Sequence, residues 1–178
     1  MPWRAAINIQ GWMSPEELEW LCQQAGLVES VVEIGAWKGR ATYALCAGCP
    51  GTIYSVDHFK GSESERLSSH VEAGQRNIYQ DFKTNVGHFE NLTLLWMDSA
   101  EAVKRFAPKS IDMVFIDGGH AYDEIMPDLK AWGPVAKKML CGHDHAQDGV
   151  PRALNDYGLM PEKGPGSIWF VNLSKGEN

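Results

Sequence analysis

The sequence lacks long hydrophobic runs and has no excess of positive charge. No stretch approaches the roughly 20 apolar residues that a membrane-spanning helix needs, so we expect no membrane partner. The 16 lysine and arginine residues are scattered and are outnumbered by 23 aspartate and glutamate residues, for a formal net charge of −7. Nucleic-acid-binding proteins gather their basic residues into a patch or stripe. We therefore expect no nucleic-acid partner.

Cysteine is also scarce, with four residues at Cys22, Cys46, Cys49 and Cys141. Cys46 and Cys49 have the Cys-x-x-Cys spacing of zinc and redox sites, but Cys46 falls within a helical pattern and there is no second such pair. Reduced, buried thiols are the better interpretation, and they suggest a cytoplasmic setting. The N-terminal residues also lack the pattern of a signal peptide.

Strand-like and helix-like patterns alternate along the 178 residues. Apolar or β-branched runs at 31–35, 52–57, 92–97, 111–116 and 138–142 are separated by segments with helical spacing, while residues 58–70 are polar and are expected to form a mobile loop. This alternation predicts an α/β fold: a Rossmann-like, doubly wound sheet with helices on both faces, mostly parallel, with an antiparallel hairpin at the C-terminus. We expect a single domain over 1–178, with an arm at 1–13 and a core at about 14–173.

The segment 31–40 reads as a strand, a glycine turn and the start of a helix, the place where α/β sheets bind nucleotide-like ligands. Its pattern is Glu33-x-Gly35-x-x-x-Gly39, not the G-x-G-x-x-G of dinucleotide sites. Trp37 stands where a second glycine would let a pyrophosphate approach. An acid before the first glycine suits a ligand with an ammonium group and no phosphate. A nicotinamide-dependent oxidoreductase thus remains only the less favoured alternative.

Polar or charged side chains fall at the C-terminal end of each of the first five predicted strands. They are Glu33, Asp57, Asp98 with Ser99, Asp117 with His120, and Asp144 with His143 and His145. Ligands of open α/β sheets bind at the carboxyl edge of the strands. Aspartate also ends strands for purely structural reasons, because it favours turns. Five acidic positions at one edge favour a functional site.

The Glu33–Gly35 turn, with Asp57 and the Asp98–Ser99 pair, resembles the motifs of class I S-adenosylmethionine-dependent methyltransferases over about residues 30–172. The resemblance implies S-adenosylmethionine as the cofactor, with its methionine part near Gly35, its ribose at Asp57 and its adenine at Asp98 and Ser99. The cofactor-binding residues that it implies are Glu33, Gly35, Ala36, Trp37, Gly39, Asp57, His58, Asp98, Ser99 and Asp117.

The segment Asp117-Gly118-Gly119-His120, with Cys141 to His145, is similar to small-molecule O-methyltransferases of the catechol and macrolide-sugar types. The resemblance implies methyl transfer to the hydroxyl of a small molecule. It assigns catalytic roles to Asp117 and His120, the latter as general base. It assigns a divalent metal, Mg or Mn, to Asp117 and Asp144, and we expect His145, which follows the second acid, to be the third ligand.

The sequence departs from this subgroup after its second acid, where His145 replaces an amide or a carboxylate. Magnesium prefers oxygen ligands, whereas imidazole favours Mn, Fe or Zn. Alternatively, His120 is a turn histidine bonded to Asp117 or Asp144. A protein that binds S-adenosylmethionine without catalysis is the second functional hypothesis. The cavity must be covered by residues 1–13, 58–75 or 145–152, or by another subunit of a homo-oligomer.

Overall fold

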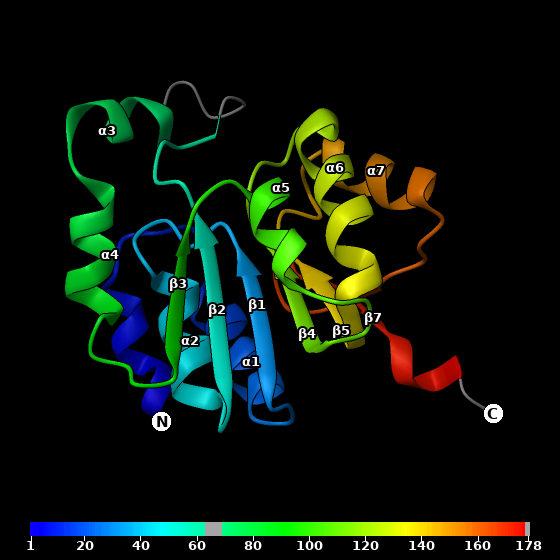
Figure 1. The fold of residues 1–178 in the computed structure, drawn as a ribbon, viewed down its shortest axis with the longest axis horizontal. Helices are drawn as coiled ribbons and strands as arrows, with labels where there is room; N and C mark the ends of the chain where they lie inside the picture. Colours follow the sequence, from blue (N-terminus) through cyan, green and yellow to red (C-terminus); the bar gives the residue numbers. More distant parts are fainter. Residues whose placement is uncertain (63–68, 177–178) are drawn as a thin grey trace.

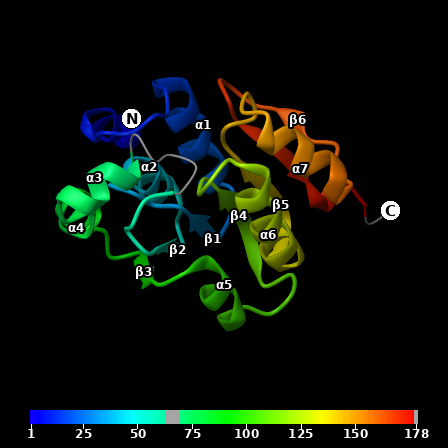
Figure 2. The same ribbon diagram turned by 90° about the horizontal axis from the view of Figure 1, so that it is seen from above.

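A computed structural model describes residues 1–62 and 69–176 as a seven-stranded sheet with helices on both faces (Figures 1 and 2). The strand order is β3-β2-β1-β4-β5-β7-β6; β1 to β5 are parallel, and β7 is antiparallel to both β5 and β6. This confirms the predicted fold class. The strands are β1 Ser30–Ile34, β2 Thr52–Asp57, β3 Leu92–Trp96, β4 Ile111–Ile116, β5 Ala136–Gly142, β6 Glu162–Lys163 and β7 Trp169–Asn172.

The helices form two layers, which Figure 2 shows from above. One layer contains η1 (Pro2–Asn8), α1 (Pro15–Ala25), α2 (Arg40–Gly48) and α4 (Ile78–Val86). The other contains α5 (Ser99–Ala102), α6 (Tyr122–Trp132) and α7 (Gly149–Tyr157). The remaining helical segments are α3 Ser69–Gln75, η3 Val103–Arg105, η4 Gly133–Val135 and η5 Leu173–Gly176. None of the described helices is long and apolar enough to cross a bilayer.

Strand β4 is the centre of the core, because all six of its residues are buried. Met113 and Phe115 pack with α1 and α2, whereas Val114 and Ile116 pack with α6 and α7. This two-residue alternation assigns each strand residue to one helical layer. The four cysteines are buried free thiols, in agreement with the structural interpretation.

The sheet reverses its order between β1 and β4, since the chain moves from β1 to β2 and β3 on one side and continues with β4 and β5 on the other. Such a switch point leaves a crevice above the carboxyl ends of the two central strands. Figure 1 shows the heads of β1, β2 and β3 at one edge of the sheet and the N-terminus of the chain at the opposite edge.

Two local predictions need correction. The polar stretch expected as a loop at 58–70 already contains the start of a helix, α3 at Ser69–Gln75; residues 63–68 lie outside the described part of the chain. The sequence also predicts a weak first hairpin strand near Leu159, but this strand lies further on, at Glu162–Lys163, because Gly158 ends α7 in a left-handed conformation with φ 85°.

Candidate active site

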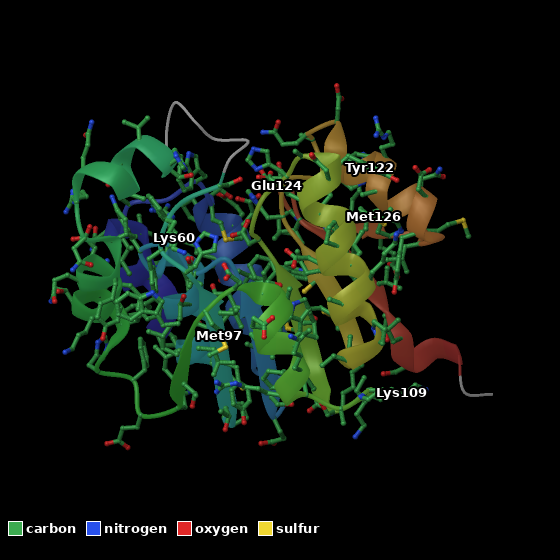
Figure 3. The ribbon with its side chains drawn as sticks, turned by 45° about the horizontal axis from the view of Figure 1, so that its top comes forward. Lys60, Met97, Lys109, Tyr122, Glu124 and Met126 are labelled. Atoms are coloured by element: carbon green, nitrogen blue, oxygen red, sulfur yellow. The ribbon has the colours of Figure 1, made fainter. Side chains whose placement is uncertain are left out.

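A cavity of about 900 Å³ opens at the carboxyl edge of the parallel strands. The loops that follow β1 to β5 form its floor and sides, and residues Gln10 to Met13 of the N-terminal arm form a further wall. In Figure 3, Met97 lies in the loop after β3 and Glu124 lies near the start of α6, whereas Lys109 lies at the other end of the sheet. The arm and the loop after β2 thus contribute to the cover, as the sequence led us to expect.

The turn after β1 touches the turn after β4 through backbone atoms alone. Gly35 has φ +88°, and a Cβ at this position would overlap the backbone of Asp117 and approach Gly118 Cα to 2.7 Å. Backbone hydrogen bonds hold the same turns: Gly35 N donates to Val56 O at 2.9 Å, and Asp117 N donates to Ile34 O at 2.8 Å. The glycine is therefore required both by its left-handed conformation and by the close approach.

Asp57 and Trp37 fix the next part of the wall. The Trp37 backbone has φ +48°, and its N–H donates to Asp57 Oδ2 at 2.7 Å. Asp57 Oδ1 accepts from Phe59 N at 2.5 Å, and burial raises the pKa of this carboxyl. The Trp37 ring lies 6.2 Å from the Trp12 ring. Asp57 is thus held at the end of β2 and lines the cavity beside Gly35.

Two residues expected to bind the cofactor lie behind the cavity wall. Glu33 is fully buried and does not line the cavity; the hydroxyls of Ser55 and Thr42 donate to its Oε2 at 2.5 and 2.6 Å. Gly39 also lies outside the lining, and a Cβ there would come within 2.9 Å of Val86 Cγ1 on α4. Both residues support the turn from its far side.

Glu33 makes stability depend on pH. Burial raises its pKa from 4.5 to about 7 despite the hydrogen bonds from Ser55 and Thr42, so between these values the folded protein binds a proton that the unfolded chain releases. The free energy of unfolding should therefore fall by about 3 kcal/mol as pH rises through this window. Urea unfolding from pH 4.5 to 8 should show this loss relative to a Glu33→Gln variant. The exposed Glu29→Gln variant is the control and should follow the wild type. Parallel curves for wild type and Glu33→Gln would contradict the assignment.

The far end of the cavity is lined by His58, Met97, Asp98 and Ser99. Ser99 is tied into the structure: its hydroxyl donates to Asp128 Oδ1 at 2.5 Å and accepts from Trp132 Nε1 at 2.7 Å. The Asp98 side chain is exposed at the start of α5. Asp98 and Ser99, which the sequence placed at the adenine, and His58, which it named among the cofactor-binding residues, all line this cavity.

Asp117, His143 and Asp144 form a cluster on the opposite side of the cavity. Their potential ligand atoms lie within 4.8 Å of one another. His143 Nδ1 is 3.6 Å from Asp117 Oδ1 and 3.3 Å from Asp144 Oδ1. The sequence pointed to His145 as the third ligand; the structure places His143 in this cluster, and His145 lies outside the cavity lining, with its backbone N–H bonded to Ser167 O. An Asp/His/Asp donor set fits a divalent cation such as Mn²⁺.

The charges of this cluster depend strongly on one another. Burial raises the pKa of Asp117 to about 8, and the neighbouring Asp144 carboxylate adds to the rise. Burial opposes the charge of His143, but its bonds to Asp144 and Glu17 raise the pKa of His143 to about 11. Burial likewise opposes ionisation of Asp144, yet His120 and His143 hold its pKa below the ordinary value. The positive charge of His143 and the negative charges of the carboxylates around it therefore stabilise one another.

His120, in the loop after β4, lies beside the cluster of Asp117, His143 and Asp144. Its Nδ1 is 3.5 Å from Asp144 Oδ2, and its side chain lines the cavity. A histidine held beside an acid in a cavity is suited to accept a proton near neutral pH. The contact with Asp144 is therefore compatible with both interpretations of His120, as a turn histidine and as a general base.

Sequence reasoning missed several cavity residues. Strand register could have found His143: Phe115 pairs with Cys141, so Asp117 and His143, two residues further on, continue the same face. The others carry no local signal, because distant segments bring them to the cavity. They include Glu124 and Asp128 of α6.

Solved structures with this fold include several methyltransferases. A putative caffeoyl-CoA O-methyltransferase from Staphylococcus aureus has 15% identity and a TM-score of 0.63, over 95% of this chain and 88% of that one. An O-methyltransferase from Bacillus cereus in complex with SAH has 16% identity and a TM-score of 0.59, over 94% and 86%. The SAH-bound Podospora anserina methyltransferase has 12% identity and a TM-score of 0.63, over 96% and 85%. At such identities the likeness establishes the fold alone.

The family itself is established by sequence. No curated protein matches the chain, but the family model described as "Methyltransferase domain" matches residues 32–144, more than half of the chain. That range begins in β1, contains the Gly35 turn and ends at Asp144, so it includes the whole row of strand ends that line the cavity. The chain belongs to the methyltransferase-domain family and is a class I S-adenosylmethionine-dependent methyltransferase.

Proposed function

We propose that the protein transfers the methyl group of S-adenosylmethionine to a hydroxyl of a small molecule, assisted by a divalent metal. The observation that carries the proposal is the Asp117–His143–Asp144 cluster, with His120 beside it, in the same cavity as Gly35 and Asp57. The similarity of fold to O-methyltransferases supports the same reaction.

The cavity residues that carry the proposal have distinct roles in this reaction. Gly35, Ala36, Trp37 and Asp57 bind and orient the cofactor at the ends of β1 and β2, while His58, Asp98 and Ser99 line its far end. Asp117, His143 and Asp144 would hold the metal. When bound, the cofactor supplies an electrophilic methyl group and the metal lowers the pKa of the acceptor hydroxyl. His120 takes the proton from that hydroxyl. Alignment of donor and acceptor in one cavity supplies much of the catalysis.

The charges on the cavity wall favour a neutral or cationic acceptor. Lys38 and Arg40 are the lysine and arginine among the described lining residues, and both are already engaged. Lys38 Nζ contacts Glu72 and Gln10. Arg40 donates to the carbonyl oxygens of residues 7, 9 and 13. A carboxylate or phosphate on the acceptor would meet acidic neighbours instead, among them Asp128 and Glu124.

Replacing His120 by alanine tests the proposed base. We expect turnover to fall about 10²-fold, the lower range for loss of a general base, with unchanged affinity for S-adenosylhomocysteine. Transfer of labelled methyl should be measured on matched neutral, cationic and anionic catechols and on sugars, with and without EDTA. His145→Ala is the control, because His145 lies outside the cavity lining.

The outcomes separate the two functional hypotheses. Turnover of a neutral or cationic hydroxyl compound that EDTA abolishes supports the metal-assisted enzyme. If wild type and His120→Ala both bind the cofactor and neither methylates any acceptor, a binding protein without catalysis is the better description. Full activity of His120→Ala would refute the role of His120 as the general base and leave the rest of the proposed function unaffected.

A further inference from the structure

Glu17 lies outside the cavity lining, yet it contacts the proposed metal cluster. It is buried in the first turn of α1, with 3% of its surface exposed. Its Oε2 accepts from Ser14 N at 2.6 Å, which completes a capping box at the start of this helix. Its other oxygen, Oε1, lies 3.0 Å from His143 Nε2, although the two residues are 126 positions apart in the chain.

A capping box requires only the contact with the N-cap residue, so the second oxygen of Glu17 serves another purpose. Oε1 also accepts from Ser167 N at 2.7 Å, in the turn between β6 and β7. The adjacent Gly166 has φ +55°, and a Cβ there would overlap this same oxygen. The helix start, the hairpin turn and the residue after β5 therefore converge on the Glu17 carboxylate, and His143 is the side chain that its Oε1 contacts.

The contact fixes which nitrogen of His143 faces the cavity. Nε2 points to Glu17, so Nδ1 is the nitrogen that faces Asp117 and Asp144. A carboxylate that accepts the N–H of one ring nitrogen leaves the lone pair of the other nitrogen free to bind a cation. It also increases the basicity of the ring and prevents its rotation, and loss of such a partner lowers metal affinity 10- to 100-fold as a rough rule.

We propose that Glu17 is a positioning residue that holds His143 with Nδ1 directed at a divalent cation shared with Asp117 and Asp144. The inference rests on the proposed function, since it requires that the cluster bind a metal. No residue of α1, Pro15–Ala25, lines the cavity. Through Glu17 this helix nevertheless becomes part of the metal centre.

Mn²⁺ affinity of the full-length protein without acceptor tests the role of Glu17. The electron paramagnetic resonance signal of free Mn²⁺ should be followed during titration of the wild type, E17Q and S14A. E17Q keeps the shape of the side chain but removes its charge, and we expect Mn²⁺ to bind about 10- to 100-fold more weakly. S14A removes the hydroxyl that accepts from Glu17 N at 3.3 Å and leaves the contact with His143. It should lower the melting temperature but bind Mn²⁺ as the wild type does.

The results distinguish this proposal from the one on which it rests. A wild type that binds no Mn²⁺ overturns the metal site and the role of Glu17 together. Mn²⁺ binding that is equal in wild type and E17Q overturns only the role of Glu17. If E17Q does not fold, E17D replaces it: the charge remains, but the side chain is one methylene shorter and withdraws from His143. Wild-type affinity in folded E17D would also overturn the proposal.

Discussion

Replacing Asp144 by asparagine should lower turnover about 10³-fold, because several kcal/mol of charge stabilisation by the metal would be lost. Asp144 contributes to the cluster with Asp117 and His143, and it also contacts His120 at 3.5 Å. Its backbone is left-handed, with φ 59°. Asparagine tolerates this conformation well, so the substitution removes the charge without straining the loop.

Asp148→Asn is the matched control for this prediction. Asp148 lies four residues further along the chain, makes no side-chain cap at the start of α7 and does not line the cavity, so its replacement should leave turnover within twofold. Steady-state rates and bound Mn²⁺ should be measured for both variants. An Asp144→Asn variant that keeps its metal and more than a tenth of wild-type turnover would refute the assignment of Asp144 as a ligand.

Replacing Gly35 by alanine should have the largest effect on stability, a loss of more than about 4 kcal/mol, which places it among exceptional single substitutions. Two costs add: the left-handed backbone at φ +88° disfavours any Cβ, and this Cβ would overlap the backbone of Asp117. Backbone atoms cannot move aside as a flexible side chain can. The turns after β1 and β4 would separate, and affinity for S-adenosylhomocysteine should fall with them.

Gly158→Ala separates the two costs. Gly158 has nearly the same conformation, φ +85°, but a Cβ there would meet nothing within 4 Å. Its replacement should cost only about 1 to 2 kcal/mol, the conformational part alone. Urea unfolding measures both free energies, and calorimetric titration with S-adenosylhomocysteine measures binding. Equal losses for the two variants would mean that the contact with Asp117 does not matter.

Local patterns were sufficient for the fold. Each strand of the parallel sheet carries its own run of apolar residues, and the run 111–116, apolar except for Asp112, is the buried central strand β4. The capping residues Ser14, Pro15 and Glu17 mark the start of α1 within the sequence itself. Connections between parallel strands follow a few topological rules, so the order of these elements is enough to predict the layers.

Residues at strand ends were predictable only as a group. Asp57, Asp98, Asp117 and Asp144 reach one cavity because parallel strands end at the same edge. The direction in which each side chain points could be assigned only from the register of the paired strands. Glu33 pairs with Ser55 across the sheet and points toward α2, so it supports the turn from behind the cavity wall.

The sequence by itself determined the sheet, the glycine turn after β1 and the edge of the sheet at which the cavity opens, because these depend on periodicity and on residues within a few positions of one another. Only the tertiary structure decided that His143 joins Asp117 and Asp144. That choice depends on a carboxylate 126 residues away, Glu17, which holds the ring. Contacts over such separations leave no local pattern in a sequence, since they exist only after the helix and the sheet have packed together.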